Sequence, residues 1–147
     1  MDELLKNPEI IRQLIIEHYQ HPHNHGLVED EGYTMIHMAS ASCIDDLRLQ
    51  MKIEEDIVSD VRFDGVACTI STASTSIISD LIKGKSVEEA ATIIAEYNKM
   101  IDQEEYDVDI LGEAYAFHTV GKQANRIKCA KIGVDGLNQL LTGKSDE

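Results

Sequence analysis

The sequence predicts an α+β fold in which a small antiparallel three-stranded sheet carries helices packed on one face. Three consecutive segments between residues 33 and 63 are short and apolar, and the middle one alternates strictly as a half-buried strand does. Stretches on both sides of them repeat apolar residues at the helical spacing of three or four. Because no helix separates the strands, we expect them to form a meander that the helices cover from one side.

The first helix is predicted over residues 8–20. Asn7 has the side chain of a helix N-cap, and Pro8 suits the first helical position. The positions that recur at helical spacing are Ile10, Ile11, Leu14, Ile15 and His18. The sequence HPHNHG that follows, residues 21–26, is expected to be a loop.

The first two strands are predicted over residues 33–39 and 47–53. The second is the clearest, because apolar and polar residues alternate strictly through LRLQMKI. A turn at residues 54–56 leads into a third strand over residues 57–63. We expect Ile57, Val61 and Phe63 on its buried face and Gly65 at its end.

Helices are predicted through the rest of the chain. The first begins near Cys68 and stops at Gly84, and its run of small Ser and Thr residues is expected to pack closely on the sheet. Ser86 and Glu89 have the spacing of a capping box, which opens a helix over residues 87 to 101. A short helix is expected over residues 113–120. A last helix carries an apolar stripe of Ile127, Ala130, Val134, Leu137 and Leu141, with Cys129 off that stripe.

Length, charge and hydropathy restrict the class of protein. A chain of 147 residues favours a single domain over residues 1–147. Its net charge of −14 argues against binding nucleic acid, whose phosphates require basic residues. No apolar run is long enough to span a membrane, and the N-terminus lacks a signal-peptide core. We therefore expect a cytoplasmic protein with no membrane or nucleic-acid partner.

The three cysteines are Cys43, Cys68 and Cys129. An odd number of thiols in a chain without an export signal argues against a disulfide framework. Three thiolates and the carboxylate of Asp45 make the four ligands of a tetrahedral zinc site, and thiolates favour zinc or iron–sulfur chemistry. Scattered cysteines can also be unrelated buried residues, so spacing alone leaves both interpretations open.

Each cysteine has a setting that bears on metal binding. Cys43 and Asp45 are expected in a strand turn, where residues two apart point the same way. Cys68 is expected where a strand gives way to a helix, and the helix dipole there favours a thiolate. Arg126 precedes Cys129 by three residues on the last helix and could stabilise that thiolate.

The chain contains the stretches EHYQHPHNHG, SASCIDD, FDGVACTISTASTS and RIKCAKIGVDGL. Together they resemble the U-type iron–sulfur cluster assembly proteins, the family of SufU, IscU and the N-terminal part of NifU. EHYQHPHNHG resembles the family's DHYxNPRNxG, and SASCIDD stands where the family has NPxCGD. FDGVACTISTASTS is similar to FxGxGCxISxASxS, and RIKCAKIGVDGL is similar to RxKCAxLxWxAL. The resemblance covers nearly the whole chain and implies a SufU/IscU-like fold.

Three features place the resemblance in the SufU branch. Cys68 and Cys129 are separated by 129 minus 68, or 61 residues, which matches an insertion that IscU lacks. Lys128 stands where IscU has a histidine before its last cysteine. The LPPVK motif of IscU is absent, since the only prolines are Pro8 and Pro22.

The SufU resemblance implies a zinc-dependent sulfurtransferase. It implies zinc ligands at Cys43, Asp45, Cys68 and Cys129, with Cys43 as the acceptor of persulfide sulfur. It also implies a SufS-type cysteine desulfurase as donor, downstream iron–sulfur scaffold proteins as acceptors, and Arg126 as the family's arginine beside the site. Ile44 and Ala67 replace family glycines next to these ligands, which puts the geometry of the site in question.

Three functions remain open from sequence, and with them whether the chain is an enzyme. The first is the sulfurtransferase. The second is a scaffold that assembles and transfers a transient [2Fe–2S] cluster on the same cysteines. The third is a structural or adaptor domain whose metal site is inert or lost. His21, His23 and His25 alternate in a way that could suggest another metal site, but we expect them to be solvated surface residues, and we expect Asp46 to be solvated too.

Overall fold

The structure is a computed structural model, and it describes residues 6–39 and 44–143. Its helices and strands follow the predicted order. The elements are α1 (Pro8–Gln20), β1 (Thr34–Ala39), β2 (Asp46–Glu54), β3 (Ile57–Val66), α2 (Thr69–Ile82), α3 (Val87–Ile101) and α4 (Ile127–Leu141). The Asn7 side chain accepts a hydrogen bond from the N–H of Glu9, and Ser86 and Glu89 form the predicted capping box.

The sheet is the predicted antiparallel meander, with strand order β1-β2-β3. Ala39 of β1 pairs with Asp46 of β2, and Asp46 pairs in turn with Val66 of β3. The β2–β3 hairpin turns through Glu55 and Asp56, which both have positive φ angles, as a tight hairpin turn requires. Asp46 and Val66 therefore lie at the same end of the sheet, where the candidate ligands also come together.

A bulge in β3 corrects one sequence prediction. Lys52 pairs with Asp60 and Ile53 pairs with Val58, so Ser59 is an extra residue in β3. The bulge changes which residues face the core. Val58 and Val61 are both fully buried, whereas Ile57, predicted to be buried, is 39% exposed.

Gly65 lies within β3 and does not end it, contrary to prediction. Its φ angle is +129°, which non-glycine residues rarely adopt. A Cβ at this position would lie 2.1 Å from the carbonyl oxygen of Asp46. The absence of a side chain lets β3 remain paired with the first residues of β2, directly beside Asp45.

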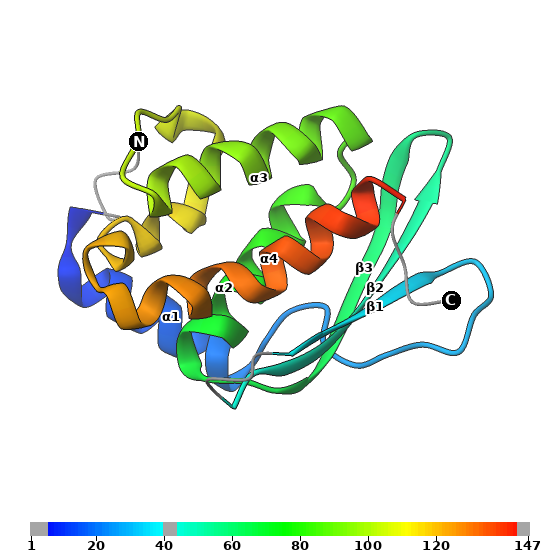
Figure 1. Ribbon diagram of the computed structural model, residues 1–147, viewed down its shortest axis with the longest axis horizontal. Helices are drawn as coiled ribbons and strands as arrows, with labels where there is room; N and C mark the ends of the chain where they lie inside the picture. The colour runs from blue at the N-terminus through cyan, green and yellow to red at the C-terminus, as the bar shows by residue number, and fades with distance from the viewer. Residues whose placement is uncertain (1–5, 40–43, 144–147) are drawn as a thin grey trace.

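The helices gather on one face of the sheet, as predicted (Figure 1). α4 packs on β1 and β2, and α2 lies against α1, α3 and α4 as well as β3. The core between these layers includes Leu47, Leu49 and Met51 of β2 and Ala130, Val134 and Leu137 of α4. No helix among the described residues is both long enough and apolar enough to span a membrane.

The segment between α3 and α4 is a series of short 3₁₀ helices. The sequence predicted one short helix over residues 113–120 instead. The turns are Val108–Ile110, Gly112–Phe117, Val120–Lys122 and Ala124–Arg126. Phe117 is buried in the core, so tertiary packing rather than local propensity holds this segment against the helices.

Candidate metal centre

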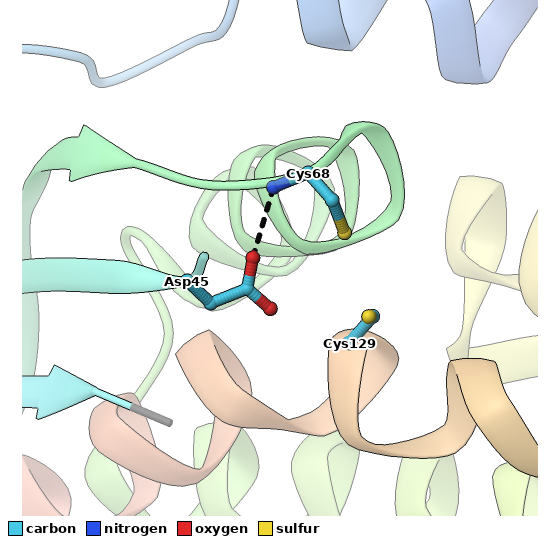
Figure 2. Close-up of side chains that lie close together, drawn as sticks. All are labelled: Asp45, Cys68 and Cys129. Carbon is cyan, nitrogen blue, oxygen red and sulfur yellow. Dashed lines mark hydrogen bonds between the residues drawn. The ribbon is translucent and has the colours of Figure 1, made fainter. Parts of the chain in front are cut away.

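Asp45 lies just before β2 and is 2% exposed. Its Oδ1 accepts a hydrogen bond of 2.9 Å from the backbone N–H of Cys68, which Figure 2 shows as a dashed line. A buried carboxylate is costly unless it is paired or hydrogen-bonded. The contact therefore both compensates for burial and ties the start of β2 to the start of α2.

Cys68 is the N-cap residue of α2, as the predicted change from strand to helix implies. Its Sγ accepts a hydrogen bond of 3.4 Å from the backbone N–H of Ser71. The free N–H groups and the dipole at a helix N-terminus stabilise negative charge on a nearby atom. Ala67, which replaces a family glycine, does not have a positive φ angle, so its backbone needs no glycine.

Cys129 lies in the first turn of α4 and is partly buried. The helix is held there by Tyr97 of α3, whose hydroxyl donates a hydrogen bond of 2.8 Å to the carbonyl oxygen of Ala130. Complete burial raises the pKa of Tyr97 well above its ordinary value, so the hydroxyl stays protonated and remains a donor.

α2 and α4 approach closely at Thr75 and Gly133. A Cβ on Gly133 would lie 1.9 Å from Thr75 Oγ1, so only glycine allows this separation. α2 therefore packs chiefly against neighbouring helices. The sequence predicted instead that its small residues pack on the sheet. Cys129 lies one helical turn before Gly133 on α4, so this contact sets how near Cys129 comes to α2.

The donor atoms of Asp45, Cys68 and Cys129 all lie within 4.8 Å of one another. In Figure 2 the two sulfur atoms point toward each other, and the Asp45 carboxylate lies beside them. Within residues 6–39 and 44–143, no other group of three or more His, Cys, Asp or Glu side chains is close enough to share a metal ion. Cys43, the fourth predicted ligand, lies outside the described residues.

These three donors fit a zinc ion. Zinc–ligand bonds of about 2.0–2.3 Å in a tetrahedron separate neighbouring donor atoms by roughly 3.5–3.8 Å. The observed limit of 4.8 Å means that the donors need to close by about 1.3 Å at most. Each carboxylate oxygen has two lone pairs, so Asp45 can keep its hydrogen bond to Cys68 while it binds a metal.

Arg126 and Asp46, the other charged residues singled out near the ligands, are both exposed. Arg126 is the residue before α4 and lines a groove with Thr69, the neighbour of Cys68. Asp46 Oδ1 lies 2.6 Å from Nε2 of His37 on the neighbouring strand and does not join the group of donors.

The three loop histidines are exposed, as predicted, and two of them pair with aspartates. His23 contacts Asp80 through Nδ1, and His25 Nε2 lies 3.2 Å from Asp64 Oδ1. The preceding helix carries a buried histidine, His18, whose Nδ1 lies 2.7 Å from Ser76 Oγ. Burial lowers the pKa of His18, with a smaller contribution from His23.

Sequence reasoning missed Ser71, which the structure places against two candidate ligands. Its hydroxyl donates a hydrogen bond to Asp45 Oδ2 and lies 3.3 Å from Cys68 Sγ. The signal was present in the spacing. Ser71 follows the N-cap residue Cys68 by three positions, which is the spacing at which a capping side chain meets a backbone N–H.

Comparisons with known proteins agree with the fold and with the family resemblance. The family model for the NifU-like N-terminal domain matches residues 10–130. The zinc-dependent sulfurtransferase SufU of Bacillus subtilis (strain 168) is 38% identical over 131 residues, which are 88% of each chain. The iron–sulfur cluster assembly scaffold protein IscU of Streptococcus pyogenes serotype M1 is 32% identical over 139 residues, covering 94% of this chain and 86% of the relative.

Two solved structures resemble most of the chain. FiSufU of Fervidobacterium islandicum AW-1, described as a candidate iron–sulfur cluster assembly scaffold protein, has a TM-score of 0.83 at 28% identity. The match covers 88% of this chain and 94% of FiSufU. An N-terminal NifU-like protein of Brucella abortus has a TM-score of 0.75 at 17% identity, over 97% and 98% of the two chains. At that identity the likeness supports the fold alone.

Proposed function

The chain belongs to the NifU-like N-terminal domain family of iron–sulfur cluster assembly, and we propose that within it this protein is a zinc-dependent sulfurtransferase. The proposed ligands are Cys43, Asp45, Cys68 and Cys129. The observation that carries the proposal is the convergence of three of these donors from three separate elements, with ligand atoms within 4.8 Å of one another. Their chemistry of two thiols and one carboxylate suits zinc.

The proposed reaction is the transfer of one sulfur atom to Cys43. The Cys43 thiolate attacks the outer sulfur of a cysteine persulfide on the donor protein and forms a new S–S bond. The S–S bond of the donor breaks, and its cysteine leaves as a thiolate. When bound, zinc keeps cysteine ligands deprotonated at neutral pH.

The proposed ligands have different roles in this reaction. Cys68 is the N-cap of α2 and Cys129 lies in the first turn of α4, so both would hold the zinc ion from rigid elements. The carboxylate of Asp45 is the one oxygen donor, and it is aimed by the N–H of Cys68. With the three thiolates, Asp45 would complete a four-ligand set for zinc, and the thiolates would select zinc over harder metal ions.

We infer that the sulfur donor is a SufS-type cysteine desulfurase and that the acceptors are downstream iron–sulfur scaffold proteins. The name of the Bacillus subtilis relative supports the sulfur-transfer part. Ile44, which precedes Asp45, and Val66, two residues before Cys68, are each 66% exposed and offer apolar surface for docking. We place the reaction in the cytoplasm, where thiols stay reduced, and assign it to one domain over residues 1–147 because the described elements share one core.

Three measurements test the proposal. Protein purified anaerobically with zinc present should be colourless and contain one zinc ion per chain. It should raise the turnover of cysteine by a SufS-type desulfurase, and Cys43→Ser should abolish that effect. Mass spectrometry should find one added sulfur atom on Cys43. Extra sulfur on Cys129 instead, with stimulation by Cys43→Ser intact, would show that the roles are wrongly assigned.

A second candidate function is a scaffold for a transient [2Fe–2S] cluster on the same residues. It is favoured by the scaffold name of the Streptococcus pyogenes relative. In that case the anaerobic protein should be coloured and contain iron and sulfide. A colourless, metal-free protein that leaves the desulfurase unaffected would instead indicate a structural or adaptor domain.

A further inference from the structure

Ser71 is fully buried, and its hydroxyl contacts two of the candidate ligands, lying against Asp45 and 3.3 Å from Cys68 Sγ. Its hydroxyl donates a hydrogen bond of 2.5 Å to Asp45 Oδ2. Its backbone N–H donates to Cys68 Sγ at 3.4 Å. Since Cys68 N–H donates to the other oxygen, Asp45 Oδ1, both oxygens of the carboxylate have a donor.

The backbone that carries the Ser71 hydroxyl is itself well held. Ser71 occupies the third position of α2, and its carbonyl oxygen accepts a hydrogen bond of 2.7 Å from Thr75 Oγ1. Thr75 is in turn the residue against which Gly133 of α4 packs. Thr75 therefore connects the backbone of Ser71 to the contact between α2 and α4 that brings Cys129 toward Cys68.

We propose that Ser71 is a positioning residue for Asp45: its hydroxyl holds the carboxylate at the angle from which it binds the metal ion. The assignment rests on the proposed function, in which Asp45 is a ligand. A carboxylate with one donor can rotate about its side-chain bonds, whereas two donors on different oxygens fix its plane. Hydrogen bonds of this kind orient ligating side chains, and their loss typically weakens metal binding by about 10–100-fold.

The test compares Ser71→Ala with Ser74→Ala in the full-length protein. Ser74 is the matched control, because it is equally buried on α2 and donates a hydrogen bond to the carbonyl of Ser71 rather than to a candidate ligand. Zinc affinity is measured by competition with a chromophoric chelator. Ser71→Ala should weaken zinc binding by about 10–100-fold, and Ser74→Ala should stay close to wild type.

Two more variants separate positioning from a general loss of stability. In an Asp45→Ala background, removing the Ser71 hydroxyl should change zinc affinity by less than about twofold, because the group that it orients is gone. Ser71→Thr keeps a hydroxyl and should retain most of the affinity. If Ser71→Ala fails to fold, the comparison is made between Ser71→Thr and Ser71→Val, which has nearly the same shape without the hydroxyl.

Each outcome is decisive. Equal zinc affinities for Ser71→Ala and Ser74→Ala would overturn the assignment of Ser71 while leaving zinc binding by the wild type intact. The same loss in the presence and absence of the Asp45 carboxylate would also overturn it. A wild-type protein that binds no zinc in this assay would overturn the metal centre of the proposed function and the role of Ser71 together.

Discussion

Gly133→Ala should loosen the metal centre without altering any ligand. The new Cβ would lie 1.9 Å from Thr75 Oγ1 and 3.0 Å from Thr75 Cβ. A carbon–oxygen contact normally needs about 3.3 Å, so α2 and α4 must separate locally by about 1.4 Å. Thr75 is buried and its hydroxyl is bonded to the Ser71 carbonyl, so the side chain has no open space to move into.

The displacement should reach Cys129, which lies one turn away on α4. Zinc–ligand distances hold to about ±0.2 Å, so a shift of this size takes the sulfur out of bonding range unless the helix deforms. Overpacking of a core costs about 1–3 kcal/mol. We therefore expect the free energy of unfolding of the metal-free protein to fall by about that amount, and zinc affinity to fall by about tenfold or more.

The assay combines urea unfolding of the metal-free protein with chelator competition for zinc. Gly136→Ala is the control, because its Cβ would meet Leu49 Cδ1 and Met38 Cγ at 2.7 Å, which belong to longer side chains on β2 and β1 rather than to the short, branched Thr75 of α2. Gly136→Ala should keep its zinc affinity. Adding Thr75→Ala to Gly133→Ala should restore part of the affinity, measured against Thr75→Ala alone. If Gly133→Ala binds zinc as tightly as Gly136→Ala, the helix contact does not set the geometry of the site.

Three further results are expected. Removing zinc with a strong chelator should lower the melting temperature by roughly 5–15 °C, because a few kcal/mol of stabilisation are lost at about 2–4 °C per kcal/mol. An unchanged melting temperature would show that zinc does not stabilise the fold. Burial lowers the pKa of His18 in the folded state, so the unfolded chain binds the proton more readily and the free energy of unfolding should fall as pH drops below about 6.5. His18→Asn should reduce this dependence of the melting temperature on pH. An unchanged pH dependence in the variant would exclude His18 as its source. Ser86→Ala removes the capping box of α3 and should lower the free energy of unfolding in urea by about 1 kcal/mol with zinc affinity unchanged; a loss of zinc binding would mean that the cap acts beyond α3.

Local chemistry made most of the elements predictable. Asn7 and Pro8 fix the start of α1, and the Ser86–Glu89 capping box fixes the start of α3, because each signal acts within one helical turn. The buried face of β3 was not predictable, since a bulge at Ser59 reverses the alternation and depends on pairing with β2.

The sequence could predict which residues are candidate ligands, but not their arrangement in space. The cysteine count, Asp45 and the family motifs indicated the donors, but not the contacts that orient them. Ser71 is one of several small residues in a row, and only its spacing of three from Cys68 distinguishes it from Ser74. Its role depends on Asp45, 26 residues earlier, and the position of Cys129 depends on Gly133 packing against another helix.

The spread of the donors along the chain bears on the order of events during synthesis. Cys68 and Cys129 are separated by 129 minus 68, or 61 residues, and α4 follows α2 and α3 in the chain. At about 5–20 residues per second, a ribosome needs roughly 3–12 s to add the intervening chain. Throughout this interval Asp45 and Cys68 lack their third partner, and the face of α2 that α4 covers is open. Metal loading at the complete proposed site would therefore wait until α4 has left the ribosome and docked on α2.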